Sequence, residues 1–354
     1  MTEEKSKWQL TVDFIMILGK YLETPRDFIN VMKVCKRYEE LVSMYKFNPI
    51  SDISLFENIQ TQHFYDENDI RNKKNNLFQY IYWYIVNYDD IINKNKNEIF
   101  KRIILKSYGN YHNITYPKID IINGNCILPK NIIIIDTGCF FSNENLLSIN
   151  LPNTLKEIRG DAFEGTKITT VNIPEGVTKI GGMCFSNCQQ LTNITLPTTL
   201  KVIGAISFLN TEITSIIIPE GVTCLGYACF QNCSSLTNVI LPHSLNSLQI
   251  STFENSNIKS IIIPEGITSI GNNCFKNCTC LSNLQLPDSL INLGNEAFKN
   301  TGITTVSIPK SVQVIGIGCF FNCKKLNLVI LLTNNNIIIE DSLDNDTKIL
   351  KIQN

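Results

Sequence analysis

The chain has 354 residues, more than one small hydrophobic core organises, so its length predicts either several domains or a repeat array. Its 31 basic and 32 acidic residues leave a net charge of −1, and this balance argues against nucleic acid or an anionic membrane as the partner. The number of cysteines, thirteen, is odd, which favours reduced thiols in a cytoplasmic protein. The longest apolar run near the N-terminus is residues 14–18, which is too short for membrane insertion.

Residues 1–50 predict a small α-helical domain. Residues 8–22 can form one amphipathic helix, and residues 24–41 carry apolar side chains at a helical spacing. Thr24 suits the N-cap, and Pro25 suits the first turn, where a backbone N–H has no partner within the helix. We expect these helices to cap the first coil of the repeat array that follows, because stacked repeats need a capping terminal unit.

The second of these segments also resembles the second half of an F-box. The positions that carry the resemblance, and that would contact an adaptor, are Leu22, Pro25, Phe28, Val34, Cys35, Lys36, Arg37 and Tyr38. A tyrosine replaces the usual tryptophan, and the opening Leu-Pro is missing because Thr11 follows Leu10. The resemblance implies docking of a Skp-type adaptor, whereas the residue pattern alone requires only a cap. Both interpretations stay open.

Residues 51–117 lack the repeat and predict a helical and irregular linker. Residues 53–56 and 59–61 fit a degenerate first coil. Residues 77–86 are too aromatic to lie in water, so we expect them to pack against the end of the array. Five basic residues between positions 94 and 106 predict a solvated helix face.

An internal repeat occupies residues 118–332. Prolines recur at alternating gaps of 23 and 22 residues, and a phenylalanine stands eleven residues after each proline. The prolines are Pro129, Pro152, Pro174, Pro197, Pro219, Pro242, Pro264, Pro287 and Pro309; the phenylalanines are Phe140, Phe163, Phe185, Phe208, Phe230, Phe253, Phe275, Phe298 and Phe320. Nine such pairs predict nine copies of one structural unit.

Each unit reads Leu-x-x-Ile-x-Leu-Pro-x-x-Leu-x-x-Ile-Gly-x-x-x-Phe. The residues one and three before the proline, such as Leu196 and Ile194, have the period-two spacing of one strand face, so we expect them to point inward. The proline ends the strand because it has no N–H to donate, and the glycine permits a tight corner. One unit therefore predicts one coil, and stacked coils pool their apolar side chains in one core.

This pattern resembles the BspA-like, or Treponema-type, leucine-rich repeats, which occur in bacteria and in protozoa including amoebae. The resemblance implies a β-rich leucine-rich-repeat solenoid of about nine coils over residues 118–332, with residues 333–354 as a C-terminal cap. It also implies protein recognition as the general function of the class.

Two kinds of coil alternate, one with Ile-Pro-Glu-Gly and one with Leu-Pro-x-(Thr/Ser)-Leu. The first kind carries a Cys-Phe-x-Asn-Cys motif, at Cys184/Cys188, Cys229/Cys233, Cys274/Cys278 and Cys319/Cys323. Neighbouring pairs would lie about 10 Å apart, too far to share one zinc ion, and the other coils have small residues there. We interpret the cysteines as small core residues.

No catalytic, cofactor or metal site is predicted. The three histidines, at His63, His112 and His243, have no spacing typical of a triad or a metal pair. The glycines lie at coil corners rather than in a phosphate-binding loop. The row formed by Glu175, Glu220 and Glu265 is interpreted as a solvated edge.

The residue two before each proline points outward, and in three successive coils it is isoleucine: Ile217, Ile240 and Ile262. Thr195 and Gln285 flank this row, which predicts an apolar centre with a polar rim. A neighbouring outward row is small and polar, with Asn193, Ser215, Asn238 and Ser260, followed by Asn283. The alternatives are that isoleucine only favours strands, or that another part of the chain covers the row.

We therefore expect a non-catalytic, monomeric scaffold that binds a globular protein on the outward strand face. The more specific hypotheses are a cytoskeletal regulator that binds monomeric actin, a substrate receptor of a ubiquitin ligase that docks a Skp-type adaptor, and a surface adhesin.

Overall fold

The computed structural model describes residues 61–64, 67, 79–87, 89, 98–105, 119, 121–332, 343 and 348–351. The chain divides into two compact units, residues 1–103 and residues 104–354. The two predicted helices and the F-box-like positions of residues 22–38 lie outside the described residues.

Within the first unit, strands stand where a helical linker was predicted. Strand β1 (Thr61–Phe64) pairs in parallel with β2 (Gln79–Asn87), and β3 (Glu98–Leu105) follows in the sequence. The aromatic stretch lies on β2, and Lys101 and Arg102 lie on β3, so the prediction of a basic helix face is wrong for these two residues. Tyrosine and isoleucine dominate β2, isoleucine dominates β3, and such residues favour strands over helices.

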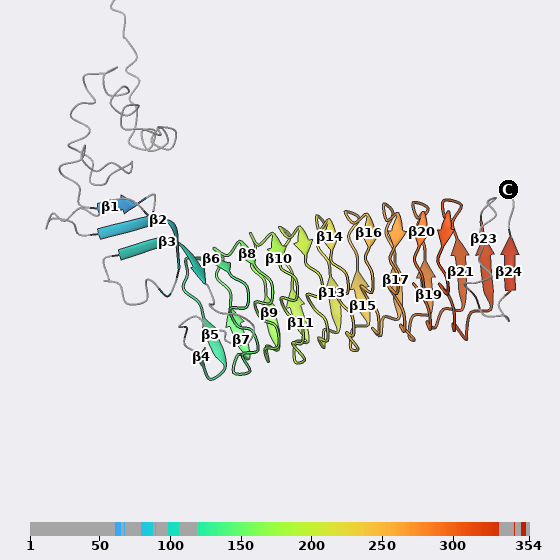
Figure 1. Cartoon of the computed structure of the whole chain (residues 1–354), viewed down its shortest axis with the longest axis horizontal. Helices are drawn as coiled ribbons and strands as arrows, with labels where there is room; N and C mark the ends of the chain where they lie inside the picture. The colour runs from blue at the N-terminus through green and yellow to red at the C-terminus, as the bar shows by residue number, and fades with distance from the viewer. Residues whose placement is uncertain are drawn as a thin grey trace, which may run out of the picture. The chain divides into compact units, whose positions relative to one another are not determined.

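The second unit is a solenoid of stacked coils, which confirms the predicted fold class (Figure 1). Each coil contributes one strand just before its proline. These strands line up as the first ladder, which divides into five short sheets. The first ladder consists of β5 (Asn125–Ile127), β7 (Ser148–Asn150), β9 (Thr170–Asn172), β11 (Asn193–Thr195), β13 (Ser215–Ile217), β15 (Asn238–Ile240), β17 (Ser260–Ile262), β19 (Asn283–Gln285), β21 (Thr305–Ile308) and β23 (Leu328–Leu331). A short hairpin precedes it, because β4 (Ile121–Ile122) pairs antiparallel with β5.

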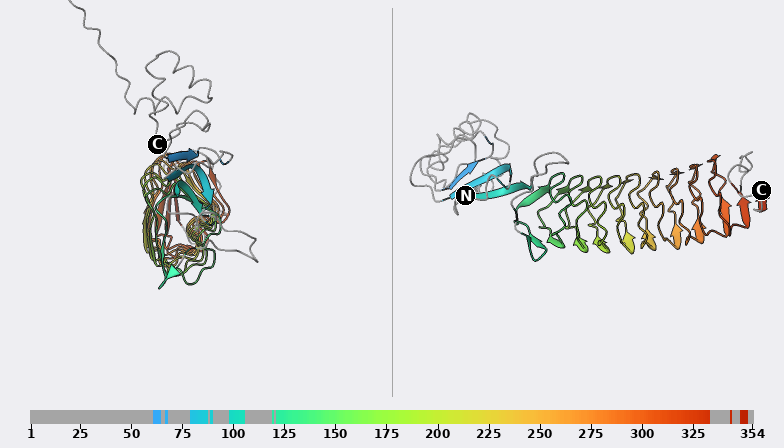
Figure 2. Two further views of the ribbon diagram at one scale, coloured as in Figure 1. Left: turned by 90° about the vertical axis from the view of Figure 1, so that its left-hand side faces the viewer. Right: turned by 60° about the horizontal axis from the view of Figure 1, so that its bottom comes forward.

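A second ladder of shorter strands follows the prolines (Figure 2). It consists of β6 (Ile132–Ile135), β8 (Glu157–Ile158), β10 (Lys179–Ile180), β12 (Val202–Ile203), β14 (Cys224–Leu225), β16 (Ser247–Leu248), β18 (Ser269–Ile270), β20 (Asn292–Leu293) and β22 (Val314–Ile315). One sheet contains β6 to β14, and a separate sheet contains β16 to β22. The second ladder is thus interrupted between β14 and β16.

The core lies between the ladders and the turns that carry the phenylalanines. Ring centroids of neighbouring phenylalanines are 5.1 to 5.6 Å apart, and the rings are nearly parallel. Ile194 is buried as predicted, whereas Leu196 is only half-buried. Each coil buries too little apolar surface to be stable alone, and the continuous stack supplies the missing contacts.

The glycines that follow the second-ladder strands allow neighbouring coils to approach closely. A Cβ atom on Gly226 would lie 2.2 Å from the Ala205 nitrogen, and one on Gly204 would lie 2.4 Å from the Gly182 nitrogen. Neither glycine has a positive φ, so the predicted corner conformation is not the reason for glycine here. Gln249 takes this place in the coil where the second ladder is interrupted, whereas Arg159 takes it in a coil whose strand β8 pairs with both neighbours.

The two kinds of coil are joined in pairs. The carboxylate of Glu175 accepts hydrogen bonds from the backbone N–H and the hydroxyl of Thr198, at 2.9 and 3.0 Å. The N–H of Gly176, whose φ is +96°, donates to the hydroxyl of Thr199. In the same way, Glu220 accepts a hydrogen bond from the N–H of His243, and Glu265 accepts one from the N–H of Asp288. The glutamate row is exposed, but it links coils and is more than a solvated edge.

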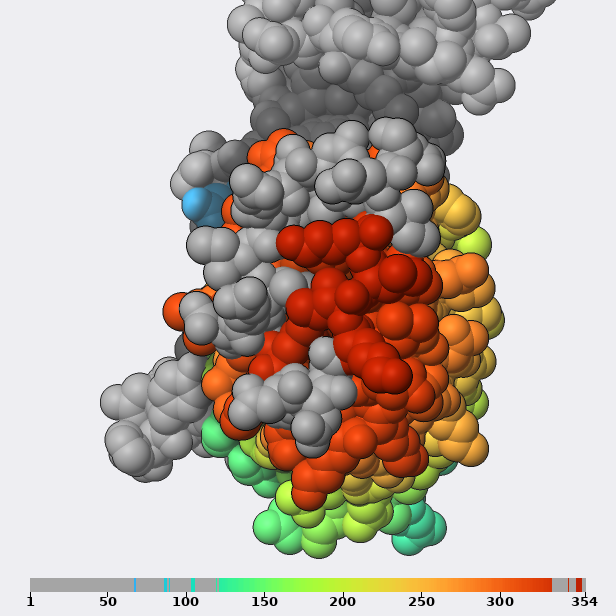
Figure 3. All heavy atoms as spheres, turned by 90° about the vertical axis from the view of Figure 1, so that its right-hand side faces the viewer, coloured from blue at the N-terminus to red at the C-terminus, as the bar shows by residue number. Residues whose placement is uncertain are grey.

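The C-terminal part of the solenoid extends past the predicted last coil. Strand β24 (Lys348–Lys351) pairs in parallel with β23, with Leu328 opposite Lys348. Figure 3 shows β24 in red at this end of the unit, and all four of its residues are exposed. Part of the predicted C-terminal cap therefore continues the first ladder.

Candidate protein-interaction surface

The predicted isoleucine row lies on the outward face of the first ladder. The exposed fractions of Ile217, Ile240 and Ile262 are 66, 50 and 72%. Ile217 lies opposite Ile240 in the paired strands β13 and β15, and β17 places Ile262 on the next coil. The prediction of an exposed row is confirmed, and no other segment among the described residues covers these side chains.

Polar residues border the row at both ends and along one side. Thr195 and Gln285 are exposed, and Gln285 lies opposite Ile262. The neighbouring row is also exposed and consists of Asn193, Ser215, Asn238, Ser260 and Asn283. The middle residue of each strand is buried, because side chains alternate between the two faces of a strand. The strand period therefore produces both outward rows.

The face carries no charge in its centre. Strands β11, β13, β15, β17 and β19 read NIT, SII, NVI, SII and NLQ, without an ionisable side chain. A partner would meet apolar side chains together with amide and hydroxyl groups. Such a surface binds through burial of apolar area and hydrogen bonds, not through ion pairs.

Backbone hydrogen bonds hold the start of these strands from coil to coil. The N–H of Thr192 donates to the Thr169 carbonyl at 3.0 Å, and the N–H of Thr237 donates to the Thr214 carbonyl at 3.0 Å. Both hydroxyls reach the same carbonyls, at 3.3 and 3.2 Å. The face is thus preorganised, which lowers the entropic cost of binding.

The paired cysteines lie in the core, as predicted. The Cys188 thiol donates to the Phe163 carbonyl at 3.1 Å and lies 3.3 Å from the Thr166 hydroxyl. Burial raises the pKa of the Cys188 thiol to about 11, and it has the same effect on Cys233 and Cys278. Since the thiolate is the nucleophile and the metal ligand, such thiols are suited to packing. Within the described residues, no three side chains of histidine, cysteine, aspartate or glutamate form a group that would hold a metal ion.

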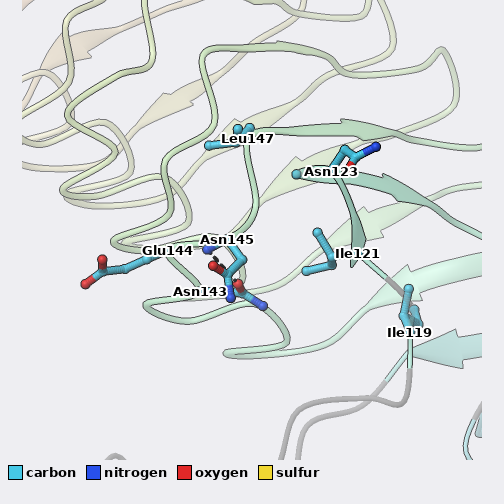
Figure 4. Close-up of a pocket in the computed structure, with 8 residues that line it drawn as sticks. Ile119, Ile121, Asn123, Asn143, Glu144, Asn145 and Leu147 are labelled. Atoms are coloured by element: carbon cyan, nitrogen blue, oxygen red, sulfur yellow. Dashed lines mark hydrogen bonds between the residues drawn. The ribbon is translucent and has the colours of Figure 1, made fainter.

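Sequence reasoning missed a shallow pocket at the start of the solenoid (Figure 4). Its volume is about 490 Å³, and Ile119, Ile121 and Leu147 form its apolar side. Asn143 and Glu144 lie on its polar side, where Glu144 pairs with a lysine of the next coil at 3.0 Å. The pocket depends on the β4–β5 hairpin, which lies outside the repeat pattern.

Sequence reasoning also missed a second apolar group, which we name the corner cluster: the exposed Met183, Tyr227 and Ile250 and the half-buried Ile206. These residues lie between the second ladder and the phenylalanine turns of four successive coils. The signal is visible only when the residues two and three before each phenylalanine are aligned coil by coil, because turn residues have no hydrophobic period.

Among the described residues, there is no helix whose length and apolar character would let it cross a bilayer.

Comparisons with known proteins agree with this fold. The model of the family described as BspA type leucine rich repeat region matches residues 122–237, 201–327 and 246–353. No curated protein matches the chain. A leucine-rich repeat protein from Bacteroides ovatus is 26% identical, with a TM-score of 0.58, and the match covers 70% of this chain and 77% of that one. One from Eubacterium ventriosum is 18% identical, with a TM-score of 0.45, and the match covers 75% and 77% of the two chains.

The family matches extend over most of the described solenoid and over well more than half of the chain. The coil pattern of proline, glycine and phenylalanine and the stacked ladders agree with them. The chain belongs to the BspA-type leucine-rich repeat family.

Proposed function

We propose that this chain is a non-catalytic scaffold that binds a globular protein on the outward face of its first ladder. The observation that carries the proposal is the exposed row of Ile217, Ile240 and Ile262 between polar Thr195 and Gln285. An apolar centre with a polar rim is the usual anatomy of a protein interface. The family assignment supports a binding role, because its repeats form scaffolds.

The chemistry of the face describes the partner. Each isoleucine presents a branched apolar side chain, so the partner has apolar side chains that pack against the row. Asn193 and Asn238 offer amide donors and acceptors at its side, which fix orientation. The uncharged centre predicts binding that depends little on salt, since screening acts on charges.

We place this binding in a reducing compartment, the cytoplasm. The support for this setting is that all twelve cysteines among the described residues are free thiols. Monomeric actin and a Skp-type adaptor are the candidate partners, the adaptor through residues 22–38. A surface adhesin that binds proteins of another cell is the alternative. Purified actin, purified adaptor and an extract of surface proteins distinguish the three.

The test of the proposed face is a pair of matched variants. In Ile240→Asp a charge enters the centre of the row, and in Val314→Asp the same charge enters an exposed strand position of the second ladder. In a pull-down with tagged chain, we expect Ile240→Asp to lose the bound partner and Val314→Asp to retain it. A central contact of this kind is worth about 2 kcal/mol or more, which is a loss of about 30-fold in affinity.

Circular dichroism of both variants shows whether the solenoid is intact. If Ile240→Asp folds normally and retains the partner with unchanged affinity, the row is not the binding site.

A further inference from the structure

The outward face of the first ladder is symmetric about the coil that carries Asn238 and Ile240. In the row of residues two before each proline, the coil on either side of this one also has isoleucine, and the next two coils on either side have polar residues. In chain order this row consists of Asn172, Thr195, Ile217, Ile240, Ile262, Gln285 and Ser307, all of which are exposed. The row therefore reads the same from either end in its polar and apolar character.

The neighbouring row, four before each proline, has the same symmetry in residue type. In chain order it consists of Thr170, Asn193, Ser215, Asn238, Ser260, Asn283 and Thr305, all of which are exposed. The alternation of two kinds of coil accounts for the serines and asparagines. It does not account for the isoleucines, because Ile217 and Ile262 belong to one kind of coil and Ile240 to the other. The symmetric apolar centre is thus a feature of its own.

A face of this kind is complementary to a second copy of itself. When one copy is turned by 180° about an axis that lies between the two faces, along the strand of the central coil, the order of its coils is reversed. Ile217 then faces Ile262 of the second copy, and Ile240 faces its own equivalent. In this arrangement the isoleucines of one copy meet only the isoleucines of the other.

The polar row is self-complementary for a chemical reason. An amide or a hydroxyl group is both a donor and an acceptor, so it can hydrogen bond to a copy of itself. The rotation places Asn193 opposite Asn283 of the second copy, and Asn238 opposite its own equivalent. These three exposed amides bond to no other described residue, so their donors and acceptors are available. A row of carboxylates could not pair in this way, because like charges repel.

Charged side chains lie only along the edges of this face. On the edge beyond the prolines, Glu175 would face Lys310 of the second copy, an opposite charge, whereas Glu220 would face Glu265, a like charge. Both Glu220 and Glu265 already accept backbone N–H groups from the next coil of their own chain. The attractive and repulsive contacts at this edge offset each other, so the uncharged centre determines the pairing.

We propose that the free chain pairs with a second copy of itself through this face, with the coils in opposite order. The proposal deepens the function proposed above, and it rests on that function for the claim that the isoleucine row is a binding surface. A globular partner and the second copy compete for the same side chains, among them Ile240. A weak dimer then takes the place of the monomer expected from the sequence.

The shape and size of the face determine how strong this pairing is. The first ladder runs almost straight from β9 to β21 (Figure 1), so two faces can meet over all seven coils. Seven strands about 4.8 Å apart make a face about 30 Å long, and three residues make it about 10 Å wide. The pair buries on the order of 600 Å² in total, less than the ~1,200–2,000 Å² of stable complexes. The dimer is therefore reversible, with a dissociation constant between about 1 μM and about 1 mM.

The first test exchanges charges on the symmetry axis. Ile240→Asp and Ile240→Lys should each be monomeric in sedimentation velocity at concentrations at which the unchanged chain dimerises, because each variant places two equal charges opposite one another. An equimolar mixture of the two should dimerise more strongly than either alone, since Asp then faces Lys. The matched controls are Val314→Asp and Val314→Lys, at an exposed position of the second ladder, and each should dimerise like the unchanged chain.

The second test determines the order of the coils. In a chain whose exposed Cys224 and Cys280 are replaced by serine, Asn238→Cys should form a disulfide between copies under mild oxidation. Asn193→Cys alone should not, because its equivalent lies four coils away, about 19 Å. A mixture of the Asn193→Cys chain with an Asn283→Cys chain should form the disulfide. Gel electrophoresis without reductant measures each product.

Three results would overturn the proposal. They are a monomer at every concentration up to about 1 mM, no more dimer in the mixture of charged Ile240 variants than in either alone, or an Asn193→Cys disulfide that forms as fast as the Asn238→Cys disulfide. The substituted side chains are exposed, so the variants should fold, which circular dichroism checks. A monomeric chain that loses a captured partner in Ile240→Asp contradicts only the dimer, and a dimer that captures no partner contradicts only the proposed function.

Discussion

Glu220 holds His243 of the next coil at two points. Its Oε2 accepts the backbone N–H of His243 at 3.1 Å, and its Oε1 lies 3.0 Å from the ring Nδ1. The His243 side chain, and next its backbone N–H, hold the pKa of Glu220 below its usual range. Because the folded-state pKa is depressed, the contribution of Glu220 to stability is present above the unfolded-state pKa and is lost as pH falls through the folded value.

Replacement Glu220→Gln should therefore lower the midpoint of thermal unfolding slightly at neutral pH. The effect is small because both side chains are exposed to solvent. The difference between the variant and the unchanged chain should shrink in acid, where Glu220 is protonated. Circular dichroism melting curves at both pH values measure it. A difference of equal size at neutral and acid pH would contradict a role for the ionised carboxylate.

The stacked phenylalanines should dominate stability. Phe230 packs between Phe208 and Phe253, at centroid distances of 5.2 and 5.6 Å. Phe230→Ala removes a fully buried ring, leaves a cavity, and should lower the free energy of unfolding by about 3–5 kcal/mol. Urea denaturation measures the loss. The control is Phe321→Ala, on an exposed ring, which should change the value by about 0.5 kcal/mol or less.

Gly226→Ala should force neighbouring coils apart, because the added Cβ would lie 2.2 Å from the Ala205 nitrogen. We expect a loss of about 1–3 kcal/mol and faster hydrogen exchange of the Gly226 N–H, which donates to the Ile203 carbonyl. Gly182→Ala is the control, since the next coil already has Ala205 at the equivalent position and the nearest atom would be 3.3 Å away. Equal losses in the two variants would show that approach between coils is not the reason for Gly226.

The thiols should divide into two classes of reactivity. Cys224 and Cys280 are exposed, whereas Cys188 and Cys233 are buried and burial raises their pKa to about 11. In the folded chain, iodoacetamide should label the exposed pair rapidly and leave the buried pair unmodified until the protein unfolds. Mass spectrometry of peptides measures each site. Rapid labelling of Cys188 under native conditions would contradict the packing described for it.

The sequence predicts the solenoid and the isoleucine row because both depend on short-range rules. Proline and phenylalanine repeat at a fixed interval, and the period of a strand then assigns Ile240 to the outer face and Val239 to the inner one. No tertiary information is needed for either step.

Other features depend on contacts between coils and could not be predicted. From the sequence alone, Gly226 is interpreted as a corner glycine, because the close approach of Ala205 is known only from the structure. From the sequence alone, Glu175 is interpreted as solvated, because its hydrogen bond from the N–H of Thr198, 23 residues later, depends on how the coils stack. The strands β2 and β3 lie outside the repeat, so only weak local preferences applied to them. The corner cluster was missed because its members come from turns, where neighbouring residues in the chain reveal nothing about the shared surface.

The hydrogen bonds that Glu175, Glu220 and Glu265 accept also limit how the number of coils can change by deletion or duplication. Loss of one coil would bring two coils of the same kind together, and a glutamate would then face a Pro-Glu-Gly turn in place of the threonine or serine turn that it now binds. Loss or duplication of the 45 residues between Pro174 and Pro219 leaves each junction as it is. The heritable unit of this array is therefore two coils, and each duplication would lengthen the outer face by two strands with four outward side chains open to selection.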